Sequence, residues 1–127
     1  MKNDEIIDDV SGFAMPSASK FDVFKLFSLK NRTIVITGSA QGIGRVAAIA
    51  CGKAGGNIAI TDKDLKAANK LEIELKDAGI NAKSWQLDVI FENKIIEVFE
   101  NISSHFGSLD VLINNAGTAH RNPAEEM

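Results

Sequence analysis

Three glycines lie close together in the stretch IVITGSAQGIGR, between a run of β-branched apolar residues and a segment rich in alanine. Gly38, Gly42 and Gly44 remove side chains at the point where a strand would turn into a helix. Such a turn lets the backbone approach a phosphate group closely, and the N–H groups and dipole of the following helix favour the negative charge. We expect Gly38 to permit a sharp bend, Gly42 a close approach and Gly44 tight packing of helix on strand. A tight turn that binds no ligand is the alternative.

A carboxylate follows at the end of the next apolar run. Asp62 comes eighteen residues after Gly44, at the tip of a strand expected beside the first one. A carboxylate there can accept both hydroxyls of an adenosine ribose and would repel a 2′-phosphate. The anion then belongs to a dinucleotide, and NAD is favoured over NADP, although Lys63 would offset part of the repulsion. A helix cap or an exposed loop acid is the other reading of Asp62, but Asp64 is better placed to cap the next helix.

Other chemistries lack the residues that they need. Gly52 and Lys53 do not form a P-loop, because a glycine five positions earlier and a following Ser or Thr are both missing. His105, His120 and the single Cys51 lie too far apart in the sequence to suggest a metal site. A lone loop histidine is more often solvated than catalytic, and Cys51 among alanines is typical of a small core residue. We expect no metal ion.

The composition limits the partners. The chain has 127 residues, with 14 Lys and Arg against 17 Asp and Glu, and the basic residues are scattered. Binding to a nucleic-acid backbone therefore has little electrostatic support. No apolar run approaches the roughly 18 residues of a membrane span, and the acidic start MKNDEIIDDV lacks the features of a signal peptide. We expect a soluble, cytoplasmic protein that binds neither nucleic acid nor membrane.

Strand and helix patterns alternate from Thr33 onward. Short apolar runs predict strands over residues 33–37, 57–61, 82–89 and 109–115, and helical periodicity lies between them. Because no hairpin signal joins the strands, the connections are crossovers and the sheet is parallel. The prediction is an α/β fold, a partial Rossmann-type doubly wound sheet (β-α-β-α-β-α-β, strand order 3-2-1-4) that lacks its C-terminal half. The last strand then leaves an open edge through which we expect self-association or a homo-oligomer.

The sequence divides into an N-terminal extension and one domain. Residues 1–28 form a distinct N-terminal extension, with an acidic first half that we expect to be disordered, and residues 29–127 form the domain. In the extension Phe21, Phe24 and Phe27 recur every three residues and should pack on the domain, with a membrane or a partner as the alternative.

The inward faces of the three helices follow from the apolar periodicity. The residues expected to face the sheet are Ile43, Val46, Ala47, Ala50 and Ala54; then Leu65, Ala68, Leu71 and Leu75; then Ile95, Val98, Ile102 and Phe106.

Three motifs together resemble a known family. TGSAQGIG, then LDV at the end of the third strand, then NNAG after the fourth, in this order and at these separations, resemble the classical short-chain dehydrogenase/reductase family. The resemblance runs from about Leu29 to the end of the sequence. SLDVLINNAG and NPAEEM are similar to members of the gluconate dehydrogenase or sorbose reductase type, which act on sugars and polyols.

The resemblance implies cofactor-binding roles for four groups of residues. Asp62 matches the ribose-selecting position, and Asp88 matches the carboxylate that accepts from the adenine amino group, with Val89 beside it. The residues that match the pyrophosphate loop are Gly38, Ser39, Gln41, Gly42, Ile43 and Gly44. The residues that match the motif bracing the sheet and lining the cofactor ribose are Asn114, Asn115, Ala116 and Gly117.

The resemblance does not supply catalytic residues. In this family a tyrosine is the acid/base, a lysine four residues later lowers the pKa of the tyrosine, and a serine holds the substrate oxygen. This sequence contains no tyrosine. Three readings stay open. We favour the N-terminal, cofactor-binding part of an NAD(P)-dependent oxidoreductase acting on an alcohol or carbonyl substrate, such as a sugar or polyol, with the catalytic segment in a longer chain. A non-catalytic dinucleotide-binding module and a protein-interaction module are the alternatives.

Overall fold

The computed structural model describes residues 7–8, 14–15 and 17–119. His120 lies outside these residues. Most of the first half of the extension, which we expect to be disordered, lies outside them as well. Within the described extension, β1 (Ile7–Asp8) and β2 (Ala14–Met15) form a two-stranded antiparallel pair. A short helix, α1 (Val23–Leu26), follows and begins at Asp22, whose carboxylate accepts the backbone N–H groups of the first turn.

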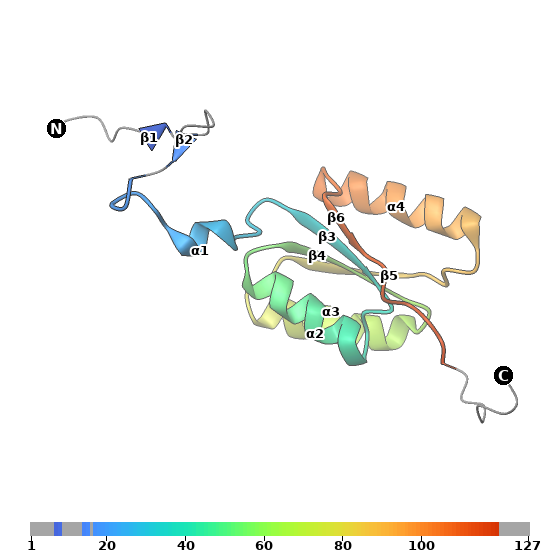
Figure 1. Cartoon of the computed structure of the whole chain (residues 1–127). Coiled ribbons are helices and arrows are strands. Elements are labelled where there is room, and N and C mark those ends of the chain that lie inside the picture. Colours follow the sequence, from blue (N-terminus) through green and yellow to red (C-terminus); the bar gives the residue numbers. More distant parts are fainter. Residues whose placement is uncertain (1–6, 9–13, 16, 120–127) are drawn as a thin grey trace, which may run out of the picture.

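A four-stranded parallel sheet forms the centre of the domain (Figure 1). Its spatial order is β5-β4-β3-β6, so the first strand of the domain lies between the second and the fourth. Every neighbouring pair is parallel, and the predicted strand order 3-2-1-4 and the Rossmann-type α/β class are confirmed. The strands are β3 (Thr33–Thr37), β4 (Asn57–Asp62), β5 (Ala82–Gln86) and β6 (Val111–Ile113).

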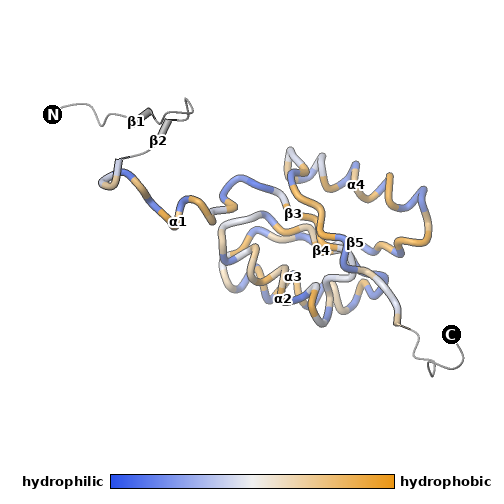
Figure 2. The backbone as a smooth tube through the Cα atoms, viewed as in Figure 1, coloured by the Kyte–Doolittle hydropathy of each residue, from blue (hydrophilic) through white to orange (hydrophobic). Residues whose placement is uncertain are grey.

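Three helices cover the two faces of the sheet. Figure 1 shows α2 (Gly42–Lys53) and α3 (Leu65–Asp77) against one face and α4 (Glu92–Phe106) against the other. Side chains along a strand alternate between the faces, so a strand covered on both sides buries every side chain, and all five residues of TIVIT are buried. Figure 2 shows the mixed character of the helices, whose hydrophilic residues alternate with apolar ones. None of the helices in the described ranges is long and apolar enough to cross a bilayer.

The core has one cluster on each face of the sheet. Ile34 and Ile36 point toward α2 and α3, whereas Val35 points toward α4. The predicted inward faces of the last two helices agree with the structure at most positions: Ala68, Leu71 and Leu75 in α3, and Val98 and Ile102 in α4, are buried. Leu65, at the start of α3, is exposed.

The predicted inward face of α2 was wrong at three of its five positions, although Ala47 does pack against the core. Ile43 and Val46 are 82% and 65% exposed, and Ala50 is exposed as well. The buried residues of α2 are instead Gly44, Ala48 and Gly52, at a spacing of four. Residues without large side chains let the helix axis approach the sheet. The face of α2 that contacts the sheet is therefore the one with the smallest residues rather than the most apolar one.

The phenylalanines of the extension do not pack on the domain. Phe21, Phe24 and Phe27 are 54%, 84% and 74% exposed, and no residue of α1 is buried. The expectation that this stripe packs on the domain was therefore wrong. Leu29 is the residue that attaches the extension, because its N–H donates to Ala54 O and its side chain packs against the core cluster beside α2.

Candidate binding site at the carboxyl ends of the strands

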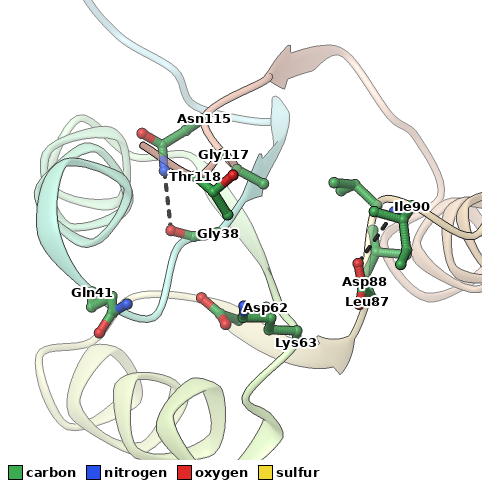
Figure 3. A pocket seen from close by; sticks show the side chains of 12 residues that line it. Gly38, Gln41, Asp62, Lys63, Leu87, Asp88, Ile90, Asn115, Gly117 and Thr118 are labelled. Carbon is green, nitrogen blue, oxygen red and sulfur yellow. Dashed lines mark hydrogen bonds between the residues drawn. The ribbon is translucent and has the colours of Figure 1, made fainter. Parts of the chain in front are cut away.

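The carboxyl ends of the strands open onto a cavity of about 520 Å³ (Figure 3). Ligands of open α/β sheets bind at this edge, and the volume lies within the range of small-molecule sites. The turn after β3, the end of β4, the loop after β5 and the loop after β6 all contribute to its wall. The lining residues are Gly38, Gln41, Asp62, Lys63, Leu87, Asp88, Val89, Ile90, Asn115, Ala116, Gly117 and Thr118.

Two positions near the start of α2 require glycine: Gly38 in the turn after β3 and Gly44 in the first turn of the helix. Gly38 has a backbone φ of 64°, and a Cβ there would lie 3.0 Å from Ala116 Cα. Gly44 has no room for a Cβ, which would collide with Gly38 O and come within 2.5 Å of Asn115 Nδ2. Gly42 also has a positive φ, 57°, but a Cβ there would meet no heavy atom within 4 Å. Gly38 and Gly44 are therefore required by close packing, whereas Gly42 leaves open space at the start of the helix.

The start of α2 is not capped by a side chain. Its N-cap residue is Gln41, whose side chain makes no capping hydrogen bond, whereas Asp64 caps α3 by accepting from Ala67 N–H. The first N–H groups of a helix need acceptors, and together with the helix dipole they favour an anion. Gln41 and Gly38 line the cavity. An anionic group in the cavity can therefore supply the acceptors that the chain does not provide.

Asn115 braces the turn from the side of β6. Its Nδ2 donates to Thr37 O and Gly38 O, both at 3.1 Å, and its N–H donates to Thr37 Oγ1 at 3.0 Å. Ala116 N–H donates to the same Thr37 hydroxyl at 3.0 Å. Figure 3 shows Asn115 reaching across to Gly38. The NNAG motif thereby ties the loop after β6 to the end of β3.

Asp62 lies at the end of β4 and is only 8% exposed. Its Oδ2 accepts from Ala40 N–H and its Oδ1 from Asp64 N–H, both at 3.0 Å. A carboxylate offers about four acceptor positions, so two remain for a ligand in the cavity. Asp88, in the loop after β5, also lines the cavity and is partly buried, and its Oδ1 accepts from Ile90 N–H at 3.2 Å.

The structure brings most, but not all, of the expected residues to one cavity. Ser39 is fully buried, and its hydroxyl bonds to Thr61 rather than facing the cavity. Asn114 is exposed outside the lining. The expected residues that line the cavity are Gly38, Gln41, Asp62, Asp88, Val89, Asn115, Ala116 and Gly117, and those outside the lining are Ser39, Gly42, Ile43, Gly44 and Asn114.

Leu87, Ile90 and Thr118 also line the cavity and were not expected there. Ile90 directly follows the LDV motif in the sequence, and this position next to Asp88 and Val89 was the signal that could have placed it at the cavity. Its side chain is largely exposed. Leu87 and Thr118 simply adjoin expected residues, and nothing in their types marked them. Among the described residues no group of three or more His, Cys, Asp or Glu side chains could hold a metal ion.

Comparisons with known proteins agree with this geometry. Residues 32–127 match the family model described as short chain dehydrogenase. Over 102 residues the chain is 41% identical to 5-keto-D-gluconate 5-reductase of Escherichia coli K12. The match covers 80% of this chain and 40% of that protein. Over 98 residues it is 36% identical to a sorbose reductase of Candida albicans, covering 77% of this chain and 35% of the relative.

Solved structures give the same result. A hydroxysteroid dehydrogenase of Escherichia coli superposes with a TM-score of 0.74 at 29% identity, covering 78% of this chain and 42% of the other. A Haemophilus influenza protein described as a D-mannonate oxidoreductase, with bound NAD, superposes with a TM-score of 0.71 at 31% identity, covering 78% and 35%. The chain thus spans 35–40% of the length of the two curated relatives. The family match over residues 32–127, with its three motifs at the carboxyl edge of a Rossmann-type sheet, shows that this chain belongs to the short-chain dehydrogenase family.

Proposed function

We propose that this chain is the nicotinamide-dinucleotide-binding part of a short-chain oxidoreductase. One observation carries the proposal: the uncapped start of α2 lies beside a cavity whose wall includes Gly38, Asp62 and Asp88. Backbone donors for a diphosphate therefore occur together with carboxylates suited to hydroxyl and amine donors. The family and the NAD-bound structural neighbour support the same type of ligand.

Each group of residues has a task toward such a ligand. The N–H groups at the start of α2 would hold the diphosphate, and the empty space at Gly42 would admit it. Asp62 would accept from the adenosine ribose and Asp88 from the adenine amino group, while Ala116 and Gly117 would line the second ribose. When bound, the nicotinamide supplies hydride transfer. None of the 127 residues matches the family's tyrosine acid, so we assign binding and no catalytic role.

The cofactor that we favour is NAD, with NADP as the second possibility. The charge of Asp62 would oppose a 2′-phosphate, whereas Lys63, which lines the same cavity, would attract it. For the substrate we propose an alcohol or carbonyl compound of the sugar or polyol class. The names of the relatives, a keto-gluconate reductase and a sorbose reductase, support this choice.

Two further proposals concern partners and location. In the described part of the chain β6 is hydrogen-bonded to a strand on one side only, and Val111 and Leu112 are partly exposed. An open apolar edge pairs readily with another strand, so we propose that the chain associates with itself there. We also propose a cytoplasmic location. A non-catalytic dinucleotide-binding or interaction module is the alternative function, and the exposed β6 edge is the observation in its favour.

Calorimetric titration with NAD tests the proposal, and the chain provides a matched pair of variants. Gly42 and Gly79 both have a positive φ, and a Cβ at either position would meet no atom within 4 Å. Replacing either by alanine introduces the same kind of strain, but only Gly42 adjoins the start of α2. We expect Gly42→Ala to weaken NAD binding at least about tenfold and Gly79→Ala to leave it unchanged. Folded wild-type chain that gives no signal at millimolar NAD would refute the proposal.

A further inference from the structure

We propose that Asp62 is a positioning residue that holds the glycine turn in place, in addition to any contact with a ribose. The inference rests on the proposed function for its consequence: loss of the carboxylate weakens binding of NADP as well as NAD. Selection alone gives the opposite result for NADP, because removing a negative charge beside a 2′-phosphate would strengthen its binding. The two roles of Asp62 are therefore separable by experiment.

The hydrogen bonds of Asp62 define the positioning role. Its Oδ2 accepts from the N–H of Ala40, inside the glycine turn, and its Oδ1 accepts from the N–H of Asp64, the N-cap of α3. One buried carboxylate thus joins the turn after β3 to the start of the helix after β4. Hydrogen bonds to an ionised acceptor are stronger than neutral ones, so this junction is a firm one.

Ser39 and Thr61 extend the junction inward. Ser39 N–H donates to Thr61 O at 3.1 Å, and Thr61 N–H donates to Ser39 Oγ at 3.0 Å. Both residues are fully buried, so water cannot replace these bonds. Together with the Ala40–Asp62 bond they form a latch, defined here as residues 39–40 of the turn bonded to residues 61–62 of β4. Asp62 is the member of the latch that lines the cavity.

The latch determines where the helix donors point. Asn115 and Ala116 already fix Thr37 and Gly38 from the side of β6. The latch fixes the next two residues from the side of β4, and α2 begins just beyond them, after Gln41. The position of the uncapped N–H groups at the start of α2 is therefore set by the preceding turn, which is hydrogen-bonded to β4 on one side and to the loop after β6 on the other. A diphosphate common to NAD and NADP would bind to those same groups, which is why both cofactors depend on the latch.

Amide hydrogen exchange on the chain without cofactor tests the latch directly. In Asp62→Ala we expect exchange at Ala40 N–H to accelerate about tenfold or more, because its acceptor is gone. Asp62→Asn keeps one acceptor oxygen but turns an NH₂ group toward the other donor, so we expect an intermediate effect. Exchange at Val35, in the buried strand β3, follows global unfolding and serves as the control, so the local effect is the acceleration at Ala40 beyond that at Val35. Asp64→Asn removes the same charge two residues away and still caps α3, so Ala40 should exchange as in the wild type.

Titration with each cofactor completes the experiment. In Asp62→Ala we expect the Kd of NAD and the Kd of NADP both to rise, each about tenfold or more, while Asp64→Asn leaves both unchanged. Unchanged exchange at Ala40 in Asp62→Ala would overturn the proposal, and so would faster exchange combined with tighter NADP binding. If the wild-type chain bound neither cofactor, the proposed function would be refuted, and the exchange measurement would still decide whether the latch exists.

Discussion

Replacing Gly44 by alanine tests the packing of α2 on the turn. An ordinary contact of a methyl carbon begins near 3.4 Å, but a Cβ at Gly44 would lie 2.5 Å from Asn115 Nδ2 and 2.9 Å from Ser39 Cα, and would collide with Gly38 O. Two of these obstacles are backbone atoms, so the cost lies at the upper end for overpacking, about 3 kcal/mol. Alanine regains about 1 kcal/mol over glycine inside a helix. The net loss of unfolding free energy is therefore about 2 kcal/mol.

Urea or thermal unfolding measures this loss, with Gly52→Ala as the matched control. Gly52 lies on the same buried face of α2, but a Cβ there would meet Ile80 Cγ2 at 2.7 Å and Ile80 Cδ1 at 2.9 Å, the ends of one rotatable side chain. We expect Gly44→Ala to lower the melting temperature by about 8 °C, and Gly52→Ala to cost less than about 1 kcal/mol. The reasoning is refuted if Gly44→Ala is as stable as the wild type, or if the two variants lose the same amount.

Three other predictions concern bracing, pH and association. Asn115→Ala should lower the free energy of unfolding, measured in urea, by about 1–3 kcal/mol, because Thr37 O and Gly38 O lose a donor. The control Asn114→Ala, at an exposed position, should stay within about 0.5 kcal/mol of the wild type. Equal losses in the two variants would contradict the bracing role of Asn115. Thr33 N–H, the Ser108 hydroxyl and Arg32 lower the pKa of Asp110. Its contribution to stability is therefore present above about pH 4 and lost as the pH falls through the lowered pKa. Asp110→Asn should destabilise the chain at about pH 7, and the loss should shrink as the pH falls below about 4. A loss in urea unfolding that is the same at every pH would contradict the lowered pKa. Leu112→Lys should convert an associating chain to a monomer on size-exclusion chromatography, whereas a compact wild-type monomer that unfolds sharply would count against association through β6.

The fold was predictable because its signals are local. TIVIT and NIAIT are dominated by apolar and β-branched residues, as is typical of strands covered on both faces, and helical periodicity between them argues against a hairpin. These two facts are enough for a parallel sheet with crossovers, and the motifs order the strands. The structure confirms the order β5-β4-β3-β6.

The face of α2 was not predictable from apolar periodicity. That pattern gives weight to Ile43 and Val46 and none to glycine, yet the buried stripe is Gly44, Ala48 and Gly52. The closeness of the helix to the sheet decides the face, and closeness depends on how the turn at Gly38 directs the chain. The phenylalanines of α1 pose a related problem, because spacing shows that side chains share a face and not that a partner covers it.

The candidate site was predictable in its members more than in their contacts. Asp62, Asp88 and Asn115 were placed at strand ends by the pattern, and all three line the cavity. The bond from Ala40 N–H to Asp62 and the pairing of Ser39 with Thr61 depend on how closely two strand ends approach each other. No spacing in the sequence reports that distance, so Ser39 was assigned to the ligand when its hydroxyl is used within the fold.

Nuclear magnetic resonance mapping of NAD binding tests the central claim most directly. The isotopically labelled chain is titrated with NAD, and the amide shifts are followed residue by residue. We predict that the largest changes lie at Gly38 and Gln41–Gly44, with further changes at Asp62–Lys63, Asp88–Ile90 and Ala116–Thr118, because these residues line the cavity or form the start of α2 beside it. Largest changes at the exposed phenylalanines of α1, or no changes at the glycine turn in a folded chain, would contradict the account.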